Sequence, residues 1–297
     1  MSSIKELSKL IKLFFQLIEL IAPKLGASVA YRFLSNPQIR KLRGREEEVL
    51  NQATQLHSNF RKFKLHGYQW GETDQPVALL IHGWEGQIGN FGALVGELQD
   101  KGYCVIGFDG PSHGKSTKAS TSMFEYADFV ERIVHEYTPK LLLTHSFGTV
   151  SAVFMLNANK DFKINQWFII TTPSDFKDRI KMVQDQIGMG EKTLKRMLSL
   201  LEKSTGHKID DMNMNAMAPQ VDQVYEIVII HSTSDKITPI EGARTTHKAF
   251  KNSDLIELEG LGHYSILWSD QVKSLLKSRV NPAKLRSDKS PASDKIH

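Results

Sequence analysis

The sequence is poor in cysteine. Its 297 residues include a single one, Cys104, so no disulfide can form within the chain and a cysteine-rich metal site is excluded. At 40% hydrophobic and 24% charged residues, the composition is that of a globular protein and excludes collagen-like and disordered chains. The length suffices for a large core with residues to spare for a lid or an arm.

A basic stripe is also missing from most of the chain. The net charge of +5 is concentrated in residues 1–64, which hold 12 Lys and Arg against 5 Asp and Glu. The remaining 233 residues hold 26 basic and 28 acidic side chains. Nucleic-acid-binding proteins carry clustered basic residues on their main fold, so the sequence predicts no nucleic-acid partner.

Residues 1–58 are predicted to form a helical arm. Apolar residues recur at helical spacing over residues 3–24, but Lys9, Lys12 and Glu19 interrupt them, which makes this helix too polar and too short to span a bilayer. The interruptions also argue against a signal peptide, so we expect a cytoplasmic protein. The arm is expected to dock on its own protein, with a homodimer contact or a peripheral membrane contact as alternatives. A second helix is predicted from Pro37 to about His57.

Short apolar runs then alternate with helical stretches, which is typical of buried parallel strands in βαβ units. The clearest runs are Val77–Ile81, Cys104–Phe108, Leu141–Leu143, Trp167–Ile170, Val224–Ile230 and Leu255–Leu258. An antiparallel pair with its turn near Gly67 is expected before them. We predict an α/β fold with a mostly parallel central sheet flanked by helices, built from residues 59–173 and 224–280. Residues 174–223 are predicted to form a helical cap, and residues 281–297 a disordered tail.

The segment from Leu141 to Gly148 carries the main chemical signal. A predicted strand runs directly into a predicted helix through a tight turn centred on Ser146, as in the nucleophile elbow G-x-S-x-G. Gly148 fits this pattern, whereas Thr144 stands where the pattern has glycine. Taken alone, a serine in this setting is more often a helix cap.

Polar residues follow other strands at the same predicted edge of the sheet. After Val77–Ile81 come His82, Gly83 and Trp84, where the backbone N–H groups of Trp84 and Phe147 could form an oxyanion hole. His82 itself is interpreted as a structural histidine. Asp235 follows the run Val224–Ile230, and His263 lies 28 residues later in a glycine-rich loop.

The order Ser146, Asp235, His263 resembles that of the α/β-hydrolase family over roughly residues 60–280. The segment from Phe108 to Ser116 is similar to a loop common in that family, in which Asp109 and His113 shape the structure; Asp175 is a spare acid. The resemblance implies a serine nucleophile at Ser146, with His263 as general base and Asp235 as its orienting acid. It implies no metal and no organic cofactor.

The predicted cap contains six of the nine methionines, among them Met182 and Met189. Methionine adapts to irregular apolar shapes, so a cap that contacts an acyl chain and plain core packing both explain this enrichment. We predict that Trp84, Phe147, Met182 and Met189 contact substrate. The sequence favours a carboxylesterase acting on small to medium apolar acyl esters. A thioesterase, lactonase or lipase with the same triad, and a catalytically silent binding protein with this fold, remain alternatives.

Overall fold

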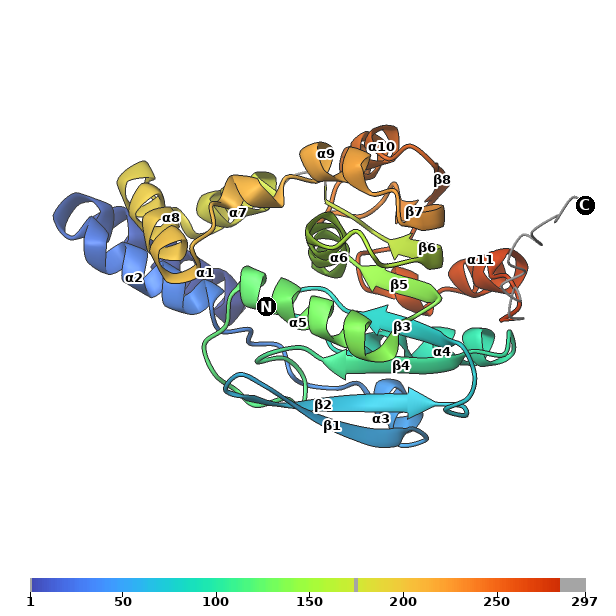
Figure 1. Cartoon of the computed structure of the whole chain (residues 1–297). Coiled ribbons are helices and arrows are strands. Elements are labelled where there is room, and N and C mark those ends of the chain that lie inside the picture. The colour runs from blue at the N-terminus through green and yellow to red at the C-terminus, as the bar shows by residue number, and fades with distance from the viewer. Residues whose placement is uncertain (1, 174–175, 284–297) are drawn as a thin grey trace, which may run out of the picture.

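A computed structural model describes residues 2–173 and 176–283, which form one sheet of eight strands with helices on both faces (Figure 1). The strand order is β1-β2-β4-β3-β5-β6-β7-β8, and β3 to β8 pair in parallel. The predicted mostly parallel α/β sheet is therefore confirmed. The strands are β1 Thr54–Phe60, β2 Phe63–Trp70, β3 Val77–Ile81, β4 Cys104–Asp109, β5 Leu141–His145, β6 Ile164–Ile170, β7 Val224–Ser232 and β8 Ser253–Leu258.

The two faces of the sheet bury separate apolar clusters. On one face α5 and α6 cover side chains such as Leu142 and Ile169, and on the other α4 and α11 cover side chains such as Leu143 and Ile170. Because the central strands are buried on both faces, they consist of almost uninterrupted apolar residues. The helices around the sheet are α3 Gly44–Leu50, α4 Gly92–Gln99, α5 Met123–Tyr137, α6 Phe147–Ala158, α10 Ile240–Ala249 and α11 Asp270–Arg279.

The segment between β6 and β7 is helical where the structure describes it. It contains α7 Phe176–Ile187, α8 Glu191–Thr205 and the single turn α9 Met214–Met217. In Figure 1, α7 and α8 lie with the N-terminal helices on the side toward which the parallel strands point. Asp175 and the tail from residue 284 onward lie outside the described residues.

The N-terminal arm differs from the predicted one. It contains α1 Ser2–Ile21 and α2 Pro23–Leu34, and the helix predicted from Pro37 to about His57 is present only as the shorter α3, Gly44–Leu50. Pro23 stands in the first turn of α2, where its missing N–H costs nothing, and the helix begins there. Residues 37–43 are non-helical, and the first strand begins at Thr54, inside the range predicted for the arm.

A carboxylate fixes α1 to α8. Glu19 of α1 accepts hydrogen bonds from the backbone N–H groups of Lys192 (2.9 Å) and Thr193 (3.0 Å) in the first turn of α8. These N–H groups have no partner within their own helix, and the positive end of the helix dipole favours a carboxylate there. The arm therefore packs on its own chain. Among the described residues, no helix has the length and apolar character needed to cross a membrane.

The predicted turn of the first hairpin is also wrong. β1 and β2 turn at Arg61 and Lys62, where Arg61 has a φ of 51°, and Gly67 lies within β2. A Cβ on Gly67 would overlap the ring of Phe108 from β4. The glycine therefore makes room for a neighbouring side chain and forms no turn.

Candidate active site

Ser146 occupies the turn between β5 and α6. Its backbone has φ 53° and ψ −122°, an unfavourable combination for a residue with a side chain. Such strain persists where the surrounding structure fixes it, and it occurs often at functional sites. The two backbone bonds that its N–H donates, to the carbonyls of Thr171 (3.0 Å) and Ile170 (3.3 Å), hold the turn in place.

Glycine at position 148 is required by a close backbone approach. A Cβ there would lie 2.5 Å from the carbonyl oxygen of Ile81 and 2.7 Å from that of His82, well inside contact distance. Helix α6 therefore starts directly against the end of β3. This approach is the physical reason for the last glycine of the elbow pattern.

Thr144 replaces the first glycine of the pattern without leaving a polar group unpaired. Its hydroxyl accepts a hydrogen bond from the indole N–H of Trp167 (2.9 Å) and pairs with the hydroxyl of Thr149 (2.8 Å). All three side chains are fully buried. The departure from the pattern is thus built into a small hydrogen-bonded cluster beneath the turn.

The structure brings Ser146, His263 and Asp235 together. The Ser146 Oγ lies 3.1 Å from Nε2 of His263, and Nδ1 of the same ring lies 2.7 Å from Oδ2 of Asp235. The three residues come from the ends of β5 and β7 and from the loop after β8. An imidazole between a hydroxyl and a carboxylate can accept the hydroxyl proton while the carboxylate stabilises the cation that results.

The Asp235 carboxylate is held in its charged form. Burial raises the pKa of this carboxyl, but the bond from His263 and the backbone N–H groups of Thr238 (3.0 Å) and Ile237 (2.8 Å) outweigh burial, so the pKa lies below its usual value. The Thr238 hydroxyl also lies 2.8 Å from Nδ1 of His263. Thr238 was not among the residues predicted from the sequence, because a threonine three residues after an aspartate carries no distinctive signal.

Two further buried histidines support the loops of the site. His145 donates from Nε2 to the carbonyl of His263 (2.9 Å), and His231 donates from Nε2 to the carbonyl of Thr238 (2.9 Å). Burial lowers the pKa of both imidazoles, of His145 well below the usual value, so both are neutral at pH 7. His145 thus anchors the backbone of His263 itself, and His231 anchors the backbone of Thr238, whose hydroxyl contacts the His263 ring.

The other polar residues of the sequence motifs are structural. His82 donates from Nδ1 to the Gly83 carbonyl (2.8 Å), and its Nε2 accepts from the Gly110 N–H (2.9 Å). The Asp109 carboxylate accepts from the N–H groups of Ile88 and Lys115, and His113 is completely buried. The ring nitrogens of His82 and His113 and the carboxylate oxygens of Asp109 form hydrogen bonds with loop backbone. This agrees with the structural interpretation of all three residues.

Gly83 brings the loop after β3 into contact with the elbow. A Cβ on Gly83 would lie 3.0 Å from the Ser146 Cβ and 3.4 Å from the Phe147 nitrogen. The next residue, Trp84, places its ring 5.7 Å from the ring of Phe147, edge to face. The two residues predicted for the oxyanion hole are therefore neighbours across the site.

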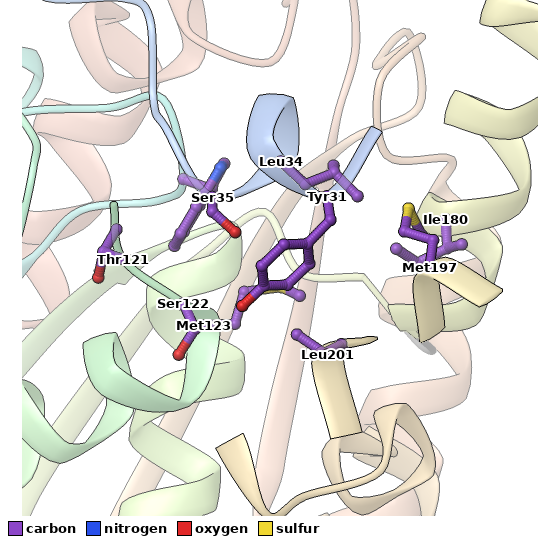
Figure 2. Close-up of a pocket in the computed structure, with 10 residues that line it drawn as sticks. Tyr31, Leu34, Ser35, Thr121, Ser122, Met123, Ile180, Met197 and Leu201 are labelled. Carbon is purple, nitrogen blue, oxygen red and sulfur yellow. The ribbon is translucent and has the colours of Figure 1, made fainter. Parts of the chain in front are cut away.

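A small, mostly apolar pocket has Trp84 among its lining residues. Helix α2 contributes Tyr31 and Leu34, and helix α8 contributes Met197 and Leu201 (Figure 2). Its volume of about 20 Å³ is little more than one water needs, so any larger ligand requires these side chains to move apart. Met189 lines a different groove, and the side chain of Met182 lies outside the described residues.

A strained serine between a parallel strand and a helix, with an aspartate and a histidine after later strands of the same sheet, is the arrangement typical of α/β-hydrolases. Residues 78–273 match the family model described as the alpha/beta hydrolase family. This match spans well over half of the chain, and the protein belongs to that family. The search of curated proteins gives no match.

Solved structures of low sequence identity share the fold. Est1E from Butyrivibrio proteoclasticus with bound ferulic acid is 16% identical, with a TM-score of 0.57 over 75% of this chain and 96% of that chain. The Pyrococcus furiosus esterase Pf2001 is 15% identical, with a TM-score of 0.56 over 81% and 93%. A membrane phospholipase A described as a bacterial virulence factor is 13% identical, with a TM-score of 0.56 over 92% and 96%.

Proposed function

We propose that this protein is a serine hydrolase that cleaves carboxylic esters with apolar acyl groups of small to medium size. The observation that carries the proposal is the continuous hydrogen-bonded arrangement from the Ser146 Oγ through His263 to Asp235. A serine hydroxyl is a weak nucleophile at neutral pH and needs a base within hydrogen-bond reach. Nε2 of His263 is at that distance.

In the first half of the reaction, Nε2 of His263 takes the Ser146 proton while Oγ attacks the ester carbonyl carbon. Asp235 stabilises the imidazolium, and the tetrahedral intermediate collapses when the imidazolium returns the proton to the leaving alcohol. The acyl group then remains on Ser146. Water, deprotonated by the same imidazole, attacks this acyl-enzyme, and the serine leaves with the proton, which releases a carboxylic acid.

The backbone N–H groups of Trp84 and Phe147 are the proposed donors to the oxyanion. The close packing of Gly83 on the elbow supports this, because it sets both peptides beside the Ser146 Cβ. Each such donor contributes about 10²–10³-fold to the rate. The mostly apolar pocket that Trp84 helps to line supports an apolar acyl group, and its small volume favours short chains over long ones in that pocket.

The test combines covalent labelling with turnover. A fluorophosphonate probe is expected to label the wild type on Ser146 and to leave Ser146→Ala unlabelled. Hydrolysis of p-nitrophenyl esters is expected to fall by at least about 10³-fold in Ser146→Ala, with an unchanged unfolding midpoint. Matched oxygen esters, thioesters and lactones of equal acyl length then identify the preferred bond. Full turnover in Ser146→Ala would exclude this mechanism, and an unlabelled wild type would favour a silent binding protein.

A further inference from the structure

Helices α1 and α2 expose many large apolar side chains. Leu20 and Ile21 at the end of α1 have exposed fractions of 78% and 82%, and Leu25 and Phe33 on α2 have 56% and 60%. Leu13 and Leu17 continue the exposed row on α1. Monomeric proteins rarely expose contiguous apolar patches this rich in leucine and phenylalanine unless the patch binds a partner. We call these six side chains the arm surface.

An apolar groove opens beside the arm surface. It has a volume of about 350 Å³ and is lined by α1, α2 and the cap, through side chains that include Phe14, Val29, Phe33, Val183 and Met189. This volume lies in the range of sites for small organic ligands. The described residues that line it are all apolar, so they offer no polar side chain to a ligand. The chemistry of the lining selects an alkyl chain.

The charges around the arm surface indicate an anionic partner. Lys9, Lys24 and Arg32 are exposed on the same two helices, and residues 1–64 carry 12 basic against 5 acidic side chains. In a symmetric dimer the same patch meets itself, so two basic arms would face each other and repel. A bilayer of anionic lipids offers both an apolar interior and negative headgroups.

The arm surface exists before any partner binds. Glu19 ties α1 to the first turn of α8, and the side chains of Phe15 and Ile18 are buried against the rest of the molecule. The exposed leucines thus lie on a helix whose opposite side is already packed. Because no described helix can cross a membrane, the contact that this geometry allows is a peripheral one.

We propose that the arm surface binds the face of an anionic phospholipid bilayer, with α1 and α2 lying among the headgroups and a lipid acyl chain entering the groove. The basic side chains Lys9, Lys24 and Arg32 contact lipid phosphates. This binding does not depend on the proposed ester hydrolysis.

The test measures co-sedimentation with vesicles of phosphatidylglycerol and phosphatidylcholine, or of phosphatidylcholine alone. The full-length Ser146→Ala protein is used so that no lipid can be hydrolysed through the proposed nucleophile. We expect binding to phosphatidylglycerol vesicles that weakens as NaCl is raised. Leu20→Glu combined with Ile21→Glu is expected to weaken binding by at least about tenfold, because two side chains lose their burial in lipid. Tyr225→Glu, at a residue 74% exposed on β7, is the matched control and is expected to bind as before.

Three results would overturn the proposal. The first is equal vesicle binding by the double variant and its parent, and the second is equal affinity for both vesicle types. The third is a parent protein that binds no vesicles and sediments as a stable dimer, while the double variant sediments as a monomer. A separate assay distinguishes a failure of this proposal from a failure of the proposed function. It measures hydrolysis of a short water-soluble ester by the double variant in the protein that keeps Ser146. That activity is expected to stay at the wild-type level.

Discussion

Replacing Gly148 by alanine tests the close approach between β3 and α6. In an isolated helix this change would stabilise by about 1 kcal/mol, because alanine is the better helix former. Here the new Cβ would meet the carbonyl oxygens of Ile81 at 2.5 Å and His82 at 2.7 Å, where ordinary contact begins at 3.4 Å. Both atoms belong to the backbone, and the His82 carbonyl also accepts a bond from the Tyr126 hydroxyl (2.6 Å). Neither can rotate away as a side chain would.

Overpacking of a core costs about 1–3 kcal/mol, and the upper end applies where backbone must move. After subtraction of the gain in helix propensity, we expect Gly148→Ala to lower the free energy of unfolding by about 2 kcal/mol. A shift of the loop that carries Gly83 and Trp84 would also displace the proposed oxyanion donors. Displacements of about 1 Å at an active site can reduce turnover by about 10²-fold, and we expect a loss of that order.

The assay is urea unfolding followed by tryptophan fluorescence, together with ester turnover. Gly96→Ala is the matched control, because Gly96 also lies within a helix, α4, and a Cβ there would meet nothing within 4 Å. We expect this control to be more stable than the wild type by about 0.5–1 kcal/mol, with unchanged turnover. If Gly148→Ala were stabilised to the same extent as Gly96→Ala, the close approach would not exist as described.

Three further predictions concern the hydrogen bonds of the site and the arm. Thr238→Val removes the hydroxyl beside Nδ1 of His263 and is expected to lower kcat several-fold with little change in KM; a change in KM alone would contradict this role. Glu19→Ala removes the bonds to the first turn of α8 and is expected to lower the free energy of unfolding by about 1–2 kcal/mol and to speed proteolysis within residues 1–34; unchanged proteolysis would contradict the docking. His113 and His145 are neutral in the fold because burial holds their pKa well below the usual 6.5, whereas the unfolded chain protonates them. Their contribution is therefore complete well above pH 6.5, and the free energy of unfolding should fall by about 2 kcal/mol between pH 6.5 and 5.5, about 1 kcal/mol for each histidine; equal urea midpoints at both values would refute it.

The sheet could be predicted from the sequence because its central strands are buried on both faces. Runs such as Val77–Ile81 and Val224–Ile230 are apolar without interruption and end in polar residues at one edge. That edge collects the residues at strand ends, and the elbow motif around Ser146 together with the family resemblance made Ser146, Asp235 and His263 joint candidates. Their mutual distances come from the structure alone.

The arm was predicted less well because its signals are local and ambiguous. The apolar periodicity of α1 continues to the end of the predicted segment and conceals the new start at Pro23. Gly67 was interpreted as a turn, yet its lack of a side chain serves the packing of Phe108. Tyr31 and Leu34 line the pocket beside Trp84 through tertiary contacts, which no pattern in residues 1–58 indicates.

The participation of Tyr31 and Leu34 in the pocket has a practical consequence for protein engineering. A recombinant chain trimmed to the family-matching segment, residues 78–273, would keep Ser146, Asp235 and His263 yet lack the part of the pocket lining that α2 provides. Binding measured on such a shortened product would describe a pocket that lacks Tyr31 and Leu34, so ligand screens should use a chain that includes α2.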